Sequence, residues 1–163
     1  MKISVLKFPP LKAKKLPESL IYESGDTIRL FSTKTGKTQG IMIARPDYVT
    51  ESGVYPRLKN FWAYYIVGLE AKERGKGVGK TLEKYVREKA KADPRCKGRI
   101  YLRAFNNIDA NHKASSTWWH ARGYKGCDKL AQADLERVLK GQRTKYGDWY
   151  MDMDMNLPVE KIK

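Results

Sequence analysis

The sequence predicts an α/β fold, because segments with strand character alternate with segments of helical character along its 163 residues. Residues 61–69 form an uncharged run of aromatic and branched side chains, which is typical of a strand covered on both faces. A glycine-rich basic segment, residues 74–81, comes next. Behind it, one apolar helical face is indicated by residues spaced three and four apart: Leu82, Tyr85, Val86 and Ala90. The order is strand, glycine-rich turn, helix.

The N-terminal part is expected to contribute further strands. Residues 2–8 alternate weakly and predict a short first strand, and a short helix is expected near residues 18–23. Residues 27–32 and 39–44 predict two strands joined by a turn that contains Gly36. The polar residues 46–60 predict a loop.

The C-terminal part alternates between the two kinds of element. Asp93-Pro94 ends the central helix, and residues 99–105 predict the next strand. A short helix with its inner face at Ala114, Thr117, Trp118 and Ala121 should stop at Gly123. Short strands are predicted at residues 124–127 and 149–155, with an additional helix at about residues 131–140 between them.

The glycine-rich segment predicts an anion site. A helix N-terminus offers unpaired N–H groups and the positive end of the helix dipole. Gly75, Gly77 and Gly79 leave the backbone open to a phosphate, and Lys76 and Lys80 add charge.

Two common phosphate-binding motifs do not fit this segment. A P-loop requires glycine where this chain has Arg74, and a dinucleotide fingerprint requires glycine where it has Lys80.

The segment resembles the acyl-CoA-binding motif of the Gcn5-related N-acetyltransferase (GNAT) family, Gln/Arg-x-x-Gly-x-Gly/Ala, through Arg74, Gly77 and Gly79. A second likeness lies at Trp119, Gly123 and Tyr124, which keep the family's aromatic-x-x-x-Gly-aromatic spacing. The resemblance covers about residues 60–127. It implies a GNAT fold, in which a single central mixed, mostly antiparallel sheet of six or seven strands splays between strands four and five and is flanked by helices.

The resemblance also implies a function, the transfer of an acetyl group from acetyl-CoA to an amine. The backbone of the fourth family strand would bind the pantetheine, and the glycine-rich turn would bind the pyrophosphate. The cofactor-binding residues implied are Val67, Gly68, Leu69, Arg74, Gly75, Lys76, Gly77, Val78, Gly79, Lys80 and Asn111. Asn111 and Ala114 match the family's Asn-x-x-Ala if the helix has gained one residue, whereas counting back from Gly123 gives His112.

The catalytic groups are less well defined by the sequence. An ammonium acceptor must lose a proton, and the carboxylates that could accept it are Glu70, Asp47 and Glu51. The family tyrosine that meets the departing thiolate is replaced by Trp119, whose indole N–H can donate a hydrogen bond but cannot give up its proton. Three outcomes stay open: an unaided thiolate, another tyrosine in that role, or CoA binding without efficient turnover.

The length and composition of the chain restrict its domain number, its cofactors and its compartment. The length predicts one domain, residues 1–163, and no segment is long and apolar enough to span a membrane. The two cysteines have no metal-ligand spacing and form no disulfide scaffold, so we expect no metal and a reduced, cytoplasmic compartment. A monomer or homodimer is expected.

The net charge of the chain indicates an anionic partner. Thirty-three Lys and Arg against 18 Asp and Glu give +15, which favours an anionic macromolecule, either nucleic acid or an acidic protein, beside acetyl-CoA. The alternative function class is a basic nucleic-acid-binding module. The alternation of Arg99, Tyr101 and Arg103 puts the tyrosine on the opposite face from the arginines, so this strand does not form a mixed stacking platform.

Overall fold

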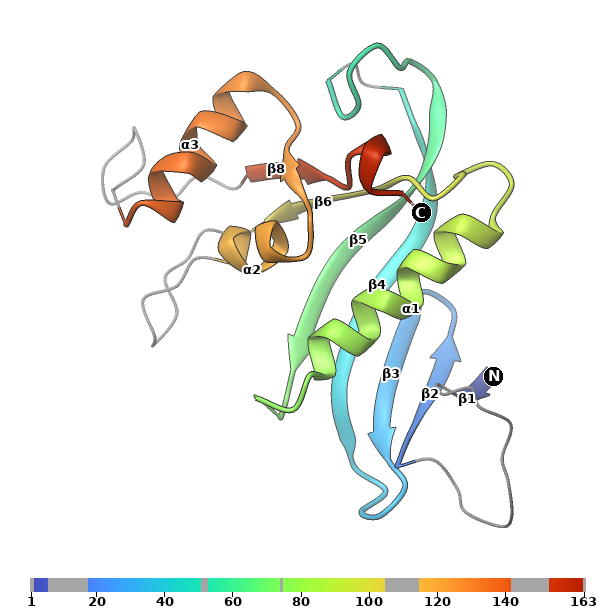
Figure 1. Ribbon diagram of the computed structural model, residues 1–163. Helices are drawn as coiled ribbons and strands as arrows, with labels where there is room; N and C mark the ends of the chain where they lie inside the picture. Colours follow the sequence, from blue (N-terminus) through green and yellow to red (C-terminus); the bar gives the residue numbers. More distant parts are fainter. Residues whose placement is uncertain are drawn as a thin grey trace. The chain divides into compact units, whose positions relative to one another are not determined.

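The computed structural model describes residues 2–5, 18–50, 53–73, 75–104, 115–141 and 153–162. Figure 1 shows its elements, which are the strands β1 (Lys2–Val5), β2 (Ser19–Ser24), β3 (Thr27–Ser32), β4 (Thr38–Val49), β5 (Phe61–Ala71), β6 (Ile100–Ala104), β7 (Lys125–Gly126) and β8 (Met153–Asn156), the helices α1 (Val78–Ala92), α2 (Ser115–Ala121) and α3 (Lys129–Leu139), and the 3-10 helix η1 (Val159–Lys161).

The strands form one mixed, mostly antiparallel sheet in the order β1-β2-β3-β4-β5-β6-β8-β7. The pairs β1/β2, β2/β3, β3/β4, β6/β8 and β7/β8 are antiparallel. β5 and β6 are neighbours joined through α1, the kind of crossover connection that a parallel pair requires. The predicted fold class is confirmed, although the described sheet has eight strands where six or seven were expected.

The described chain divides into two compact units, of which the first comprises residues 1–45 and 66–89. Its core forms where the sequence alternates in β3, with Ile28 and Leu30 buried, and where α1 buries Leu82 and Val86 one turn apart. Gly40 of β4 packs against the start of α1, since a Cβ built there would be 2.4 Å from the Cγ1 atom of Val78. A side chain at this position would displace the start of α1.

The helix predicted near residues 18–23 is wrong, because this segment is strand β2 and pairs with both β1 and β3. Ile21 is fully buried and the chain returns into β3 through Gly25, whose φ of 58° is unfavourable for other residues. Pairing on two sides outweighs the weak local preference for a helix. The loop predicted from residue 46 is also partly wrong, since β4 continues to Val49.

The second unit comprises residues 46–65 and 90–163, and Tyr55 is buried in its core. The Tyr55 hydroxyl accepts a hydrogen bond from the Ile100 N–H at 2.9 Å and donates one to the Leu157 carbonyl at 2.7 Å. The ring meets Phe61 edge-on, with 5.6 Å between the centroids. One side chain therefore joins the β4–β5 loop to β6 and to the segment after β8. Burial raises the pKa of Tyr55 well above its usual range, so the hydroxyl stays protonated and able to donate.

The helices α2 and α3 lie next to each other, and α3 also contacts β7 and β8 (Figure 1). The inner face predicted for α2 is wrong, since its buried residues are Ser116 and Trp119, whereas Trp118 is 36% exposed. The predicted additional helix is confirmed as α3, with Leu135 buried. Residues 105–114 and 142–152 lie outside the described residues, and so do the predictions made for them.

The chain leaves α1 through a turn organised by Asp93, in the second unit. The Oδ1 atom of Asp93 accepts hydrogen bonds from the backbone N–H groups of Arg95, at 2.8 Å, and Cys96, at 3.3 Å. The Arg95 guanidinium also binds both carboxylate oxygens, at 3.2 and 2.9 Å. These donors, first of all the Arg95 side chain, lower the pKa of Asp93 from 3.8 to about 2.

We therefore predict that Asp93→Asn lowers the free energy of unfolding at neutral pH by about 1–2 kcal/mol. Because the folded-state pKa is depressed, this stabilisation is present above the ordinary pKa of 3.8 and is lost as the pH falls through about 2. Urea denaturation over a pH series measures it. The difference from wild type should shrink between pH 4 and 2, and a loss that does not change with pH would contradict the assignment to the carboxylate charge. Glu136→Gln, at an exposed position of α3, is the control.

Candidate functional site

Gln39 of β4, in the first unit, holds the turn between β5 and α1 by hydrogen bonds. The backbone carbonyl of Gln39 accepts hydrogen bonds from the N–H groups of Lys72, at 2.8 Å, and Glu73, at 3.2 Å. Its side-chain amide donates to the Glu73 carboxylate at 3.2 Å and accepts from the Ser19 hydroxyl at 2.8 Å. Sequence reasoning missed Gln39, because the pairing of β4 with the end of β5 leaves no local sequence signal.

The glycines of this turn have the conformation that the sequence predicts for them. Gly75 and Gly77 have φ angles of 77° and 72°, in the left-handed region that other residues seldom adopt. A Cβ built at either position meets no atom of the described residues within 4 Å. Space beside the backbone is therefore open, as the approach of a phosphate requires. Arg74 lies outside the described residues.

The first turn of α1 presents backbone donors. The first helical hydrogen bond runs from the Thr81 N–H to the Gly77 carbonyl, at 3.0 Å. The N–H groups of Val78, Gly79 and Lys80 therefore have no acceptor within the helix. No acidic residue stands in this first turn, so nothing there opposes the positive end of the helix dipole. This geometry can bind an anionic group through three consecutive amides.

Two lysines provide charge around these amides. Lys80 is exposed, and the Lys76 ammonium lies 3.4 Å from the Glu73 carboxylate with 68% of its side-chain surface exposed. Such an exposed ion pair contributes little free energy, so Lys76 can exchange this partner for a phosphate at low cost. The Glu73 contact was not anticipated from the sequence and lowers the net charge of the turn.

The strand that leads into the turn provides the remaining predicted contacts. Val67, Gly68 and Leu69 are partly exposed in β5, and a Cβ built at Gly68 meets none of the described atoms within 4 Å. Glu70 follows on the same strand and is exposed. The first unit therefore contains the two predicted parts of the cofactor site, the end of β5 and the glycine-rich turn.

The other predicted residues belong to the second unit or are not described. Asp47 accepts a hydrogen bond from the Tyr101 hydroxyl at 2.6 Å, and Glu51 and Asn111 lie outside the described residues. Trp119 is 6% exposed and meets the rings of Trp118 and Tyr124 edge-on, with centroid distances of 4.8 and 5.2 Å. This environment is that of a packed core side chain.

Over the described ranges, no three His, Cys, Asp or Glu side chains gather as a metal site would require. Within the same ranges, no helix has the length and apolar character needed to cross a membrane. Cys96 and Cys127 are buried free thiols, and burial raises the pKa values to about 11 and about 12. These two side chains are therefore inert rather than nucleophilic.

No family model matches this chain, and no curated protein matches it. Several solved structures do match this chain. A structure described as a bacterial toxin is 14% identical, with a TM-score of 0.56 over 88% of this chain and 69% of its own. The NatC complex bound to Gag peptide and CoA is 15% identical, with a TM-score of 0.52 over 82% and 70%. AtaTR bound with AcCoA is 11% identical, with a TM-score of 0.52 over 83% and 71%. The chain therefore has the fold of the GNAT N-acetyltransferases.

Proposed function

We propose that this chain is an acyl-CoA-dependent N-acetyltransferase that moves an acetyl group directly from acetyl-CoA to an amine. The observation that carries the proposal is the start of α1, where three consecutive backbone N–H groups without helical acceptors follow two open glycines. Two of the matched structures contain CoA or AcCoA by their descriptions, which supports the same ligand for this fold.

The residues present fit a pyrophosphate. The amides of Val78, Gly79 and Lys80 donate to its oxygens, and Lys76 and Lys80 balance its charge. The backbone of Val67, Gly68 and Leu69 binds the pantetheine, and one N–H of this segment polarises the thioester carbonyl. When bound, acetyl-CoA supplies an activated acyl group: the amine nitrogen forms a bond to the carbonyl carbon, and the bond from that carbon to sulfur breaks.

The acceptor amine must first lose its proton to a base. Glu70 is exposed on β5, immediately after the residues assigned to pantetheine, so water reaches it and it can accept a proton directly or through water. Asp47, in the second unit, is the other candidate carboxylate and accepts a hydrogen bond from the Tyr101 hydroxyl at 2.6 Å.

A CoA-binding protein with little turnover is the second candidate function. The observation that favours it is the burial of Trp119, at the position of the family tyrosine, between Trp118 and Tyr124. A side chain packed in this way serves the core rather than a departing thiolate. Release of free thiol from acetyl-CoA in the presence of a panel of amines separates the two functions.

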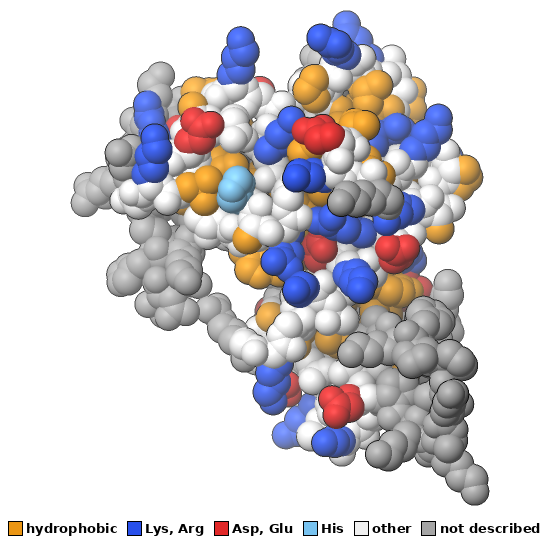
Figure 2. Space-filling view, in the orientation of Figure 1, with side chains coloured by type: hydrophobic (Ala, Val, Ile, Leu, Met, Phe, Trp, Pro, Cys, Tyr) orange, Lys and Arg blue, Asp and Glu red, His pale blue; other side chains and the backbone are white. Residues whose placement is uncertain are grey.

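The charge of the chain supports an anionic carrier for the acceptor amine. A single CoA brings only a few negative charges, whereas the chain has a net charge of +15. Figure 2 shows Lys and Arg side chains at many positions of the visible face, with fewer Asp and Glu among them. Positive charge of this size attracts nucleic acid or an acidic protein and repels a free polyamine.

The CoA site is tested by Gly79→Ala. Gly79 lies within α1, so alanine causes no backbone strain and should leave stability unchanged or raise it by up to about 1 kcal/mol. In the proposed binding mode the pyrophosphate lies against the backbone of Gly79, so the added methyl group should lower acetyl-CoA affinity by about tenfold or more. Calorimetric titration measures the affinity and thermal denaturation the stability.

The matched control is Lys84→Ala, at an exposed position later in the same helix, which should bind acetyl-CoA as wild type does. Unchanged affinity in Gly79→Ala, or an equal loss in both variants, would remove the glycine-rich turn from the site.

The role of Trp119 is tested by Trp119→Tyr. The smaller ring leaves space beside Trp118 and Tyr124, so the free energy of unfolding should fall by about 1–2 kcal/mol while the rate of thiol release does not rise. Trp118→Tyr, at the exposed neighbour, should change neither quantity. A higher rate in Trp119→Tyr with unchanged stability would instead place residue 119 at the departing thiolate.

A further inference from the structure

Three segments of the second unit meet at Trp62 and form a mixed aromatic and basic surface. We call it the Trp62 surface and define it by Tyr48 of β4, Trp62 of β5, Lys91 at the end of α1, and Arg95, Lys97 and Arg99 of the segment between α1 and β6. Residues 99–103 alone form no such platform, because Tyr101 lies on the opposite face of the strand from Arg99 and Arg103. The platform arises instead from residues that are far apart in the chain.

Stacked planar groups form the centre of this surface. The Arg95 guanidinium carbon lies 4.2 Å from the centroid of the Trp62 ring, and the Tyr48 ring lies 5.6 Å from the same centroid at an angle of 56°. Arg99 holds the arrangement, because its guanidinium donates to the backbone carbonyls of Trp62 and Arg95, both at 3.0 Å. The Trp62 indole therefore contacts both the Arg95 guanidinium and the Tyr48 phenol.

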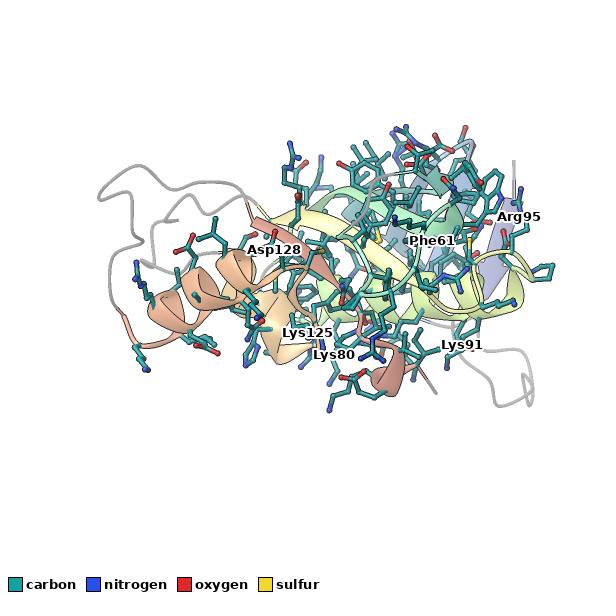
Figure 3. The ribbon with its side chains drawn as sticks, turned by 90° about the horizontal axis from the view of Figure 1, so that it is seen from above. Phe61, Lys80, Lys91, Arg95, Lys125 and Asp128 are labelled. Atoms are coloured by element: carbon teal, nitrogen blue, oxygen red, sulfur yellow. The ribbon has the colours of Figure 1, made fainter. Side chains whose placement is uncertain are left out.

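These planar groups remain accessible to a ligand. Tyr48 is 47% exposed, which is unusual for an aromatic residue in a strand, and half of the Arg95 side-chain surface is exposed. Trp62 is partly exposed. Figure 3 shows Phe61 and Arg95 on the right of the view, with Lys91 lower down on that side. The Lys91 side chain lies close to Gly98, between Lys97 and Arg99 in the sequence, since a Cβ built at Gly98 would be 3.5 Å from the Lys91 Cγ atom.

The charge of the surface is strongly positive. Residues 90–99 contain four Lys or Arg and one carboxylate, Asp93. Asp93 is already bound by Arg95 and by two backbone N–H groups, and only 13% of its side chain is exposed. Asp47 precedes Tyr48 on a strand and therefore points to the opposite face, where it binds Tyr101. A net positive field remains for an anionic partner.

The backbone of this surface is strained at one residue, Lys97. Lys97 has a φ of 53°, in the left-handed region, where a residue other than glycine costs about 1–2 kcal/mol. The next residue, Gly98, also has positive φ, at 82°. A glycine at position 97 would relieve the strain, so a lysine there retains an exposed positive charge at a cost in stability.

We propose that the Trp62 surface binds single-stranded nucleic acid, with bases stacked on Tyr48 and on the Trp62–Arg95 pair and phosphates at Lys91 and Lys97. Exposed aromatic and guanidinium planes among cations are the features on which unpaired bases stack. An acidic peptide would bind the Lys and Arg charges of this surface but would leave its aromatic and guanidinium planes without a stacking partner. A nucleic-acid duplex has no unpaired bases that could stack on these planes. The inference goes beyond acetyl transfer, because this surface would bind with or without acetyl-CoA.

The probe is a fluorescently labelled single-stranded oligothymidylate or oligouridylate of about 12 nucleotides, measured by anisotropy. Wild type should bind it, and affinity should fall steeply between about 50 and 200 mM salt. The variant Tyr48→Ala/Arg95→Gln should weaken binding by about tenfold or more, because stacking contributes about 1–3 kcal/mol per base. Arg95→Lys, which keeps the charge and loses the plane, should give an intermediate affinity.

The control for loss of charge alone is Lys34→Gln/Lys37→Gln in the exposed β3–β4 turn, which removes more positive charge and should change affinity by less than about twofold. Circular dichroism melting confirms that each variant is folded, and acetyl-CoA titration of the same samples reports separately on the cofactor site. The inference is overturned if wild type does not bind at low salt, if the control loses as much affinity as the surface variant, or if duplex DNA or polyglutamate binds as tightly as the single strand.

Discussion

The connection from β5 into α1 is the constraint on which the proposed function depends. The chain leaves the strand after Ala71 and begins the helix at Val78, so the six residues between must reverse its direction. Gln39 fixes the near end of this turn with three hydrogen bonds and is itself held by a fourth, from Ser19 of β2. Gly40 leaves room for Val78 at the far end of the turn. Two adjacent residues of β4 therefore position the turn and the helix start together.

The same constraint explains why the helix start can bind an anion. The first N–H groups of any helix lack acceptors within it. At the start of α1, in addition, no carboxylate in the first turn competes for them, and Gly75 and Gly77, just before them, have positive φ. The donors are arranged before a ligand arrives. Binding then requires little reorganisation, which is the condition for high affinity from a small number of contacts.

The sequence predicted the fold well where periodicity is strong and local. The strand at residues 61–69, the glycine-rich turn and the stripe of Leu82 and Val86 all depend on neighbours within a few positions, and the structure has each of them. The errors occur where contacts with residues far away in the chain determine the local structure. Ser19–Ser24 became a strand because β1 and β3 pair with it, and the buried face of α2 was misassigned because Trp118 and Trp119 are equally apolar.

The candidate site shows the same division. Glycine spacing identified the turn, but neither Gln39 nor the Glu73–Lys76 pair has a signal that a single sequence reveals. The Trp62 surface was missed for the same reason, since its aromatic and basic residues come from three separate segments. In each case a side chain from one segment completes a feature that another segment only begins.

The most direct test of the central claim is amide hydrogen exchange with and without acetyl-CoA. The N–H groups at the start of α1 have no helical acceptor, so they should exchange fast in the free protein. If they bind the pyrophosphate, acetyl-CoA should slow exchange at Val78, Gly79 and Lys80 more than at any position of α3. Saturating acetyl-CoA that leaves these three amides unprotected would contradict the account, whatever its effect elsewhere in the chain.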